Sequence, residues 1–533
     1  MNSMAENHKQ NKYGKKVGTD SLNKKDKRTD TKKKAEPDFN SKQTRKDGQT
    51  PAAPKKKKSR CPVSKKCGGC TMIDIAYDAQ LKNKQDLVDQ CIGDYVYPDH
   101  IIRMKNPDHY RNKVTSVFAP DRKGKPVCGI YREGTHEVIP VKECLLEDLR
   151  ADRIIQSVYS LLLSFKIRVY DEDRGTGLLK FVQVRTAHVT RQIMVTLVVA
   201  SPVFPSRNNF VKALRKLHPE ITTIVMNIND KHTTMVLGKR EQVLYGKGYI
   251  EDQLCGKTFR ISSQSFYQVN SIQTEKLYNI AIDYAGLSGK ERILDAYCGI
   301  GTIGIIASDR CKEVISVELN PDAVKDAVRN AKANDASNVS VYQGDAGKFM
   351  TSMAEQGEKL DVLFMDPPRS GSTEEFIRSA GRLAPSKIVY ISCNPRTLGR
   401  DLELLEEQGY VCRKAVPVDM FPYTMDVETC VLLVRESGKD DEVVSIKVDM
   451  DGISLDQGRY VSPAKPTYKN IKQWILDKYG FNVSTLYIAQ IKDKFGMEKR
   501  KNYNKGSGEG KVPVCPPEKE EAIMDAFRHF GLI

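Results

Sequence analysis

Residues 293–304 read Ile-Leu-Asp-Ala-Tyr-Cys-Gly-Ile-Gly-Thr-Ile-Gly, and this stretch decides the fold class. Ile293 to Tyr297 is a short apolar run typical of a buried strand, and the glycines after it predict a tight turn that opens a helix. A second strand-like run ends in Glu318, which lies 19 residues after Gly299. An acid at that spacing suits the hydroxyl pair of an adenosine ribose. The pattern therefore predicts a doubly wound, Rossmann-like α/β domain that binds an adenosine-containing cofactor.

The segments that follow favour S-adenosylmethionine (SAM) over NAD, although the glycine pattern alone suits both. Asp295 stands just before the turn, where we expect it to face the amino-acid part of the cofactor. Gly344-Asp345-Ala346 follows a third strand over residues 339–342, which is a usual place for an adenine contact. A fourth strand ends in Asp366-Pro367-Pro368-Arg369. Two consecutive prolines make a stiff, extended loop, which suits a flat base held beside a methyl donor.

A thiol follows the next apolar run, in Ile388-Val389-Tyr390-Ile391-Ser392-Cys393-Asn394-Pro395-Arg396. Ligands bind at the carboxyl ends of strands in open α/β sheets, so Cys393 is placed as a nucleophile would be. A cysteine there can also be a core residue, since free cysteines are among the most buried residue types. Asn394 and Arg396 lie in the same turn and are candidate donors to a developing oxyanion.

The first 60 residues are strongly basic, with 19 Lys and Arg against 7 Asp and Glu, in a chain of 533 residues and net charge +17. This segment holds almost no large apolar residues, so we expect it to be disordered and to suit phosphate backbones. It contains no apolar core of a signal peptide, and no run of about 18 apolar residues suggests a membrane span. We therefore expect a cytoplasmic protein, in which 13 cysteines indicate metal or catalytic use rather than disulfides.

Three cysteines follow the basic tail as Cys61-x5-Cys67-x2-Cys70, with two glycines inside the last pair. Three thiolates so close need a shared cation, and both zinc and iron–sulfur clusters accept four cysteines. Spacing alone does not separate these two metals. A fourth ligand must come from further along the chain, and Cys91, Cys128 and Cys144 are the nearest candidates. Cys91 falls in an apparent helix and Cys128 in a strand, whereas Cys144 ends a strand and is better placed.

The carboxyl-terminal part of the chain predicts a small helical module. Tyr468–Tyr479 and Thr485–Phe495 have helical apolar spacing, with Gly480 as the end of the first and Ser484 as the cap of the second. A third helix is expected from Glu518 to Phe530. Lys492, Lys494, Lys499, Arg500, Lys501 and Lys505 give the second helix and its exit a basic edge. The arrangement is similar to a helix-turn-helix, so it is either a nucleic-acid-binding module or a packing appendage.

Seven motifs, in order along residues 61 to 436, resemble the uracil-5-methyltransferase family that acts on ribosomal and transfer RNA. The branch most similar is the iron–sulfur-containing 23S ribosomal RNA methyltransferases. The motifs are Cys61/Cys67-Gly-Gly-Cys70, Tyr110-Arg111-Asn112-Lys113, Phe266-Tyr267-Gln268-Val269-Asn270, Asp295-Ala296-Tyr297-Cys298-Gly299, Asp366-Pro367-Pro368-Arg369, Ser392-Cys393-Asn394-Pro395 and Asp419-Met420-Phe421-Pro422 with Glu428.

The resemblance implies a role for each matching residue. It makes Cys393 the nucleophile that attacks uracil C6 and Glu428 the base that removes the C5 proton. It implies SAM contacts at Gln268, Tyr297, Glu318 and Asp366. It also implies a four-iron, four-sulfur cluster on Cys61, Cys67, Cys70 and Cys144. Without the resemblance, Glu428 could equally well be an exposed charged residue on a strand.

The resemblance also implies the domain order and the partner. We expect a disordered tail (1–59), a central α+β RNA-binding domain with the cluster (60–265), a Rossmann-like SAM methyltransferase domain (266–436), a linker (437–458) and the helical module (459–533). The expected partner is 23S ribosomal RNA, and no protein partner is indicated. Two features depart from the family: no small β-barrel domain precedes the cluster, and Ile73-Asp74 replace a common Gln-His.

Three other functions compete with methylation of 23S ribosomal RNA at uracil C5. Transfer RNA is the runner-up substrate. A non-catalytic RNA-binding assembly factor is a second class, which the presence of both Cys393 and Glu428 argues against. An enzyme that methylates amino groups of adenine or guanine would also use Asp-Pro-Pro, but that chemistry leaves the thiol unexplained.

Overall fold

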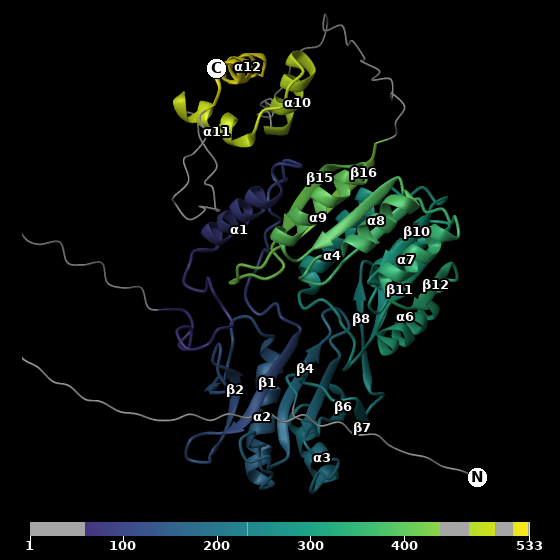
Figure 1. The fold of residues 1–533 in the computed structure, drawn as a ribbon. Helices are drawn as coiled ribbons and strands as arrows, with labels where there is room; N and C mark the ends of the chain where they lie inside the picture. Colours follow the sequence, from purple (N-terminus) through teal and green to yellow (C-terminus); the bar gives the residue numbers. More distant parts are fainter. Residues whose placement is uncertain (1–58, 232, 437–467, 496–514, 531, 533) are drawn as a thin grey trace, which may run out of the picture. The chain divides into compact units, whose positions relative to one another are not determined.

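The computed structural model describes residues 59–231, 233–436, 468–495, 515–530 and 532 (Figure 1). The disordered tail predicted for 1–59 lies outside the described residues except for Ser59, and so do the linker predicted for 437–458 and the basic residues 499–505. Among the described helices, none is both long and apolar enough to cross a membrane.

The doubly wound unit predicted from residues 293–304 is present as a seven-stranded sheet in the described part of the chain, with strand order β12-β11-β10-β13-β14-β16-β15. β10 to β14 run parallel, whereas β16 is antiparallel to both β14 and β15. All the strand predictions for this sheet are confirmed. The strands are β10 (Arg292–Ala296), β11 (Glu313–Glu318), β12 (Val339–Gln343), β13 (Val362–Met365), β14 (Lys387–Ser392), β15 (Tyr410–Val418) and β16 (Glu428–Arg435).

Helices cover both faces of this sheet, which is why its strands are apolar without alternation. Ile293, Phe364 and Val389 face α4, α5 and α6, while Leu294 and Leu363 on the other face meet α1, α7, α8 and α9. The helices are α1 (Tyr77–Ile92), α4 (Ser271–Ala285), α5 (Thr302–Ala307), α6 (Pro321–Ala333), α7 (Ala346–Glu355), α8 (Glu374–Leu383) and α9 (Pro395–Glu407), with a 3₁₀ turn η1 (Ser308–Arg310).

A second, mixed sheet precedes the Rossmann-like unit and has the described strand order β3-β2-β1-β4-β5-β6-β7. Only the β5–β6 pair is parallel among its described pairings. α2 (Leu149–Ser164) and α3 (Arg207–Leu217) pack on one face of it through Ile154, Val158 and Phe210. The strands are β1 (Lys113–Pro120), β2 (Pro126–Tyr131), β3 (Val138–Pro140), β4 (Leu179–Thr186), β5 (Ile193–Val199), β6 (Ile221–Ile228) and β7 (Arg240–Tyr245).

A hairpin joins the two sheets in sequence. Its strands are β8 (Tyr249–Leu254) and β9 (Lys257–Ser262). Ile250 and Phe259 of this hairpin belong to the same core as α4 and Met194 of the mixed sheet. The boundary predicted at residue 265 falls between β9 and α4.

The three helices predicted near the carboxyl end are present as α10 (Tyr468–Tyr479), α11 (Thr485–Lys494) and α12 (Pro517–His529). Ile471, Ile475, Ile488 and Ile491 are buried with Phe527 in a core of their own. The Ser484 hydroxyl accepts the Tyr487 N–H, which confirms the predicted cap.

Candidate active site

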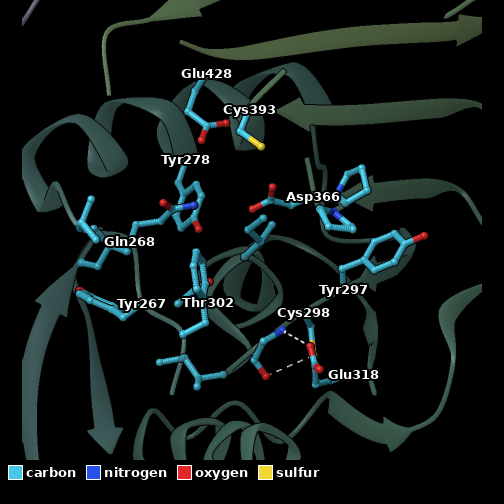
Figure 2. Close-up of a pocket in the computed structure, with 18 of the residues that line it drawn as sticks. Tyr267, Gln268, Tyr278, Tyr297, Cys298, Thr302, Glu318, Asp366, Cys393 and Glu428 are labelled. Atoms are coloured by element: carbon cyan, nitrogen blue, oxygen red, sulfur yellow. Dashed lines mark hydrogen bonds between the residues drawn. The ribbon is translucent and has the colours of Figure 1, made fainter. Parts of the chain in front are cut away.

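A cavity of about 430 Å³ lies at the carboxyl ends of the parallel strands. It is the site that an open α/β sheet offers to ligands. The six residues to which the family resemblance assigned catalysis or SAM binding all line this cavity, namely Gln268, Tyr297, Glu318, Asp366, Cys393 and Glu428. Figure 2 shows Cys393 and Glu428 at one end and Glu318 at the other, with Gln268 and Asp366 between them.

The pairing of β14 with β16 holds Cys393, directly after β14, close to Glu428, the first residue of β16. Ser392, the last residue of β14, pairs with Thr429 of β16, so the next positions along the ladder are Cys393 and Glu428. Glu428 begins its strand rather than ending it. Because β16 is antiparallel, its amino end lies at the carboxyl edge of the parallel strands, and this brings the acid to the cavity.

The Glu428 carboxyl is buried, with 3% of its surface exposed, and its Oε2 has no hydrogen-bond partner within the described residues. Burial, and then the charge of Asp366, raises the pKa of Glu428 well above its usual range, while Arg369 lowers it. A buried carboxyl without a donor is costly to the fold. This acid is therefore not the exposed strand charge that its sequence position also allowed.

The pKa values of Cys393 and Asp366 are shifted in the same direction as that of Glu428. Burial, with the charges of Glu428 and Asp366, raises the pKa of the Cys393 thiol to about 12, although Arg369 acts against this shift. Burial raises the pKa of Asp366 to about 7. Glu428 and Cys393 are thus largely protonated at neutral pH before substrate binds, whereas Asp366 is about half protonated. A bound cation would stabilise the charged forms of all three groups.

The glycine-rich turn is shaped as a cofactor loop. Glu318 Oε2 accepts the Gly299 N–H at 3.0 Å (Figure 2). Its Oε1 accepts the Asn320 N–H at 2.7 Å. A Cβ at Gly304 would lie 2.8 Å from Ser316 Oγ, so only glycine lets α5 pack this close to the sheet. Around Gly299, by contrast, no atom lies within 4 Å of an added Cβ, which leaves its backbone open to a ligand.

Three residues that the sequence suggested for the site lie elsewhere. Asp295 was expected to face the cofactor, and this is wrong: its Oδ2 accepts the Gly304 N–H at 2.8 Å, and the side chain is buried behind the turn. Asn394 caps α9 instead of lining the cavity, since its Oδ1 accepts the Arg396 N–H. Asp345 caps α7 in the same way, because its Oδ1 accepts the Lys348 N–H.

Some residues that line the cavity had received no functional role from the sequence. Arg111, Phe266 and Phe421 belong to motifs already singled out, so their positions carried a signal. Tyr278 and Thr302 carried none, because Tyr278 occupies an apolar helical position of α4 and Thr302 simply starts α5.

The loop between β15 and β16 is fastened to α1 before it delivers Glu428. Lys84 Nζ lies 2.5 Å from Asp419 Oδ1 and 2.9 Å from the Phe421 carbonyl oxygen. Both charged side chains are buried, with 0% and 1% exposed. The Tyr77 hydroxyl donates to the other Asp419 oxygen at 2.7 Å. This network fixes the segment that carries Phe421 and leads to Glu428.

The four cysteines predicted to hold a cluster lie in one neighbourhood. Cys61, Cys70 and Cys144 pack around Ile73 and Met104. Burial, and then the charges of Cys67 and Cys61, raises the pKa of Cys70 to about 12. In residues 59–231, 233–436 and the described helices of the carboxyl end, no group of three or more His, Cys, Asp or Glu is arranged to hold a metal ion.

The two other candidates for a fourth ligand lie away from these cysteines. Cys91 packs against the core that α7, α8 and α9 form with the Rossmann-like sheet. Cys128 belongs to the core of the mixed sheet, where it accepts a bond from Gln156. Of the three candidates, Cys144 is the one that joins Cys61 and Cys70.

The chain is similar to several known proteins. It is 39% identical over 387 residues to an uncharacterized RNA methyltransferase of Halalkalibacterium halodurans, covering 72% of this chain and 84% of that one. An uncharacterized RNA methyltransferase of Staphylococcus aureus is 40% identical over 377 residues, covering 70% of this chain and 83% of that one.

A solved structure has the same fold over most of its length. The Pyrococcus abyssi tRNA (uracil-54, C5)-methyltransferase in complex with S-adenosyl-L-homocysteine matches with a TM-score of 0.59 and 25% identity, over 69% of this chain and 86% of that one. Residues 76–436 match the sequence model described as tRNA (Uracil-5-)-methyltransferase. On these grounds the chain belongs to the RNA uracil-5-methyltransferase family.

Proposed function

We propose that this SAM-dependent RNA methyltransferase methylates C5 of a uridine in 23S ribosomal RNA through a covalent adduct with Cys393. The observation that carries the proposal is the convergence of a half-buried thiol and a buried carboxyl at one end of the cavity. Methylation of an exocyclic amino group would need no thiol there. A non-catalytic RNA-binding protein would need neither group.

The reaction that these residues support begins with the thiol. Uracil C5 is a poor nucleophile, so the Cys393 sulfur adds to C6 while its proton passes to solvent water, and the electron pair of the C5–C6 double bond moves into an enolate. C5 then takes the methyl group, which SAM supplies as an electrophile. The Glu428 carboxylate removes the remaining C5 proton, and that electron pair re-forms the double bond and expels the thiolate. The target base must be unstacked from its RNA to reach the thiol.

The donor side of the cavity suits SAM. In the proposal, Glu318 binds the ribose hydroxyls, and Gln268, Tyr297 and Asp366 hold the remainder of the molecule. The open backbone at Gly299 fits a close approach of the adenosine, and the shifted acids fit the positive charge of a sulfonium.

Substitution at the two reacting groups tests the mechanism. Cys393→Ala should abolish methylation while SAM still binds, and Glu428→Gln should trap an RNA adduct, seen as a slowly migrating band. Cys91→Ala removes a thiol of α1 that lies outside the cavity. This variant is the matched control and should methylate RNA as the wild type does. Methylation by Cys393→Ala would falsify the covalent route. Absence of the adduct in Glu428→Gln would count against the assigned base.

The choice of 23S ribosomal RNA rests on the cysteine motif, whereas the solved relative named above acts on transfer RNA. The two possible substrates are distinguished by mass-spectrometric mapping of 5-methyluridine in both RNAs, taken from cells with and without this protein. Loss confined to 23S ribosomal RNA is the expected result. Loss confined to transfer RNA would make that RNA the substrate.

We propose a four-iron, four-sulfur cluster on Cys61, Cys67, Cys70 and Cys144 in the assembled protein. The chemistry of the donor set suits such a group, because all four thiols are free of disulfides and Cys61, Cys70 and Cys144 share an apolar surround. When bound, the cluster would supply a structural link between the amino-terminal segment and the mixed sheet. Anaerobically purified protein should be brown, with sulfur-to-iron charge-transfer absorption that Cys144→Ser diminishes. Colourless, zinc-loaded protein would exclude the cluster.

A further inference from the structure

Three cations stand together beside the cavity. Arg111 lines the cavity wall. Lys113 begins β1, and its direct partner across the strand pair is Arg185 of β4. Burial, and then the charges of Arg185 and Arg111, lowers the pKa of Lys113 to about 8. Like charges placed directly opposite each other destabilise a sheet, so this arrangement opposes folding.

The positive charge of this trio is poorly compensated within the protein. In the described ranges, no carboxylate forms an ion pair with Lys113 or Arg185. Arg185 has 4% of its surface exposed and donates only to the carbonyl oxygens of Ser263 and Ser265. The Nε atoms of Arg185 and Arg111 are buried without a partner. Arg111 lies in the field of Glu147, whereas the charges acting on Lys113 are both cationic.

We infer that Arg111 and Lys113 bind an RNA phosphate that flanks the uridine entering the cavity, and that Arg185 is a positioning residue behind them. This inference rests on the proposed function. A nucleotide turned out of its stack brings its own phosphates to the rim of the site that receives it. Phosphate contacts position a nucleic acid, and clustered Arg and Lys are the groups that make them. Arg185 also ties β4 to Ser263–Ser265, directly before the cavity residue Phe266.

The variant Lys113→Met in the full-length protein tests the site, with in vitro transcribed 23S ribosomal RNA as the probe. We expect RNA affinity to fall about 10-fold at low salt, and the slope of log affinity against log salt to decrease by about one. The melting temperature without RNA should rise, because a like-charged pair is removed. SAM affinity should not change, and Lys113→Arg should restore RNA binding.

Lys312→Met is the matched control. Lys312 is exposed and precedes β11 at the amino edge of the sheet, opposite the cavity, so this variant should bind RNA as the wild type does. Wild-type affinity and salt slope in Lys113→Met would overturn the inference, and so would a lower melting temperature, which would make Lys113 a structural residue. Failure of the wild type itself to bind the transcript would contradict the proposed substrate instead.

Discussion

The protonation of Asp366 should make the preference for SAM over S-adenosylhomocysteine depend on pH. Burial raises its pKa to about 7, so the carboxyl is neutral below that pH and charged above it. Glu428 and Cys393 lie close enough for their charges to interact with it. SAM carries a sulfonium charge that S-adenosylhomocysteine lacks, so a charged Asp366 favours SAM through its attraction to the sulfonium.

The ratio of SAM affinity to S-adenosylhomocysteine affinity should therefore rise several-fold as pH increases through about 7. In the variant Asp366→Asn, the ratio should stay flat across the same range. Isothermal titration calorimetry with both ligands between pH 5.5 and pH 8.5 (roughly the range over which such a group changes charge) measures this. A wild-type ratio that does not depend on pH would show that Asp366 keeps one charge state throughout.

At the scale of elements, the ion pair between α1 and the β15–β16 loop should dominate the stability of that loop. Lys84→Met leaves Asp419 buried without its cation, which costs about 3–5 kcal/mol. Adding Asp419→Asn should recover part of that loss, because the uncompensated charge is gone. Urea unfolding of the single and double variants gives the coupling, and Lys82→Met, exposed on the same helix, is the control. Equal stability of Lys84→Met and wild type would mean that α1 does not fasten the loop.

The elements of the Rossmann-like unit follow from the sequence, because buried parallel strands are short apolar runs and the glycine turn has a fixed spacing. Cys393 and Asp366 were placed at strand ends for the same reason. The orientation of Asp295 was missed, since a residue at a strand end can turn either to the ligand or to the first N–H groups of the next helix. The direction of β16 was also not evident from its sequence, because a strand buried on both faces is apolar without alternation whether its neighbours are parallel or antiparallel.

At the scale of the whole molecule, the carboxyl-terminal module is expected to add RNA affinity. Residues 459–533 hold 14 Lys and Arg against 8 Asp and Glu. In the described helices, Lys478 and Lys494 are paired with Asp525 and Glu520, which reduces their contribution. The basic run at 499–505, outside the described residues, then supplies much of the expected effect.

Deletion of residues 440–533 should lower the affinity for 23S ribosomal RNA and make it less dependent on salt. SAM binding should be unaffected, because among the described residues none beyond Glu428 lines the cavity. Filter binding at several salt concentrations, with SAM titration as the control, checks both statements. An unchanged affinity and salt slope would leave the module as a packing appendage.

The antiparallel pairing of β14 with β16 has a consequence for how this protein tolerates insertions and deletions. Side chains alternate between faces along a strand, so one residue added inside β16 would exchange the positions of Glu428 and Thr429 relative to Cys393. The turn at Thr424 and Met425 lies outside that ladder and beyond the residues that α1 fastens, and Met425 is exposed, so a change in length there can be absorbed before β16 begins. We expect lineages of this protein to differ in the length of this turn while the spacing from Glu428 to the end of β16 stays constant.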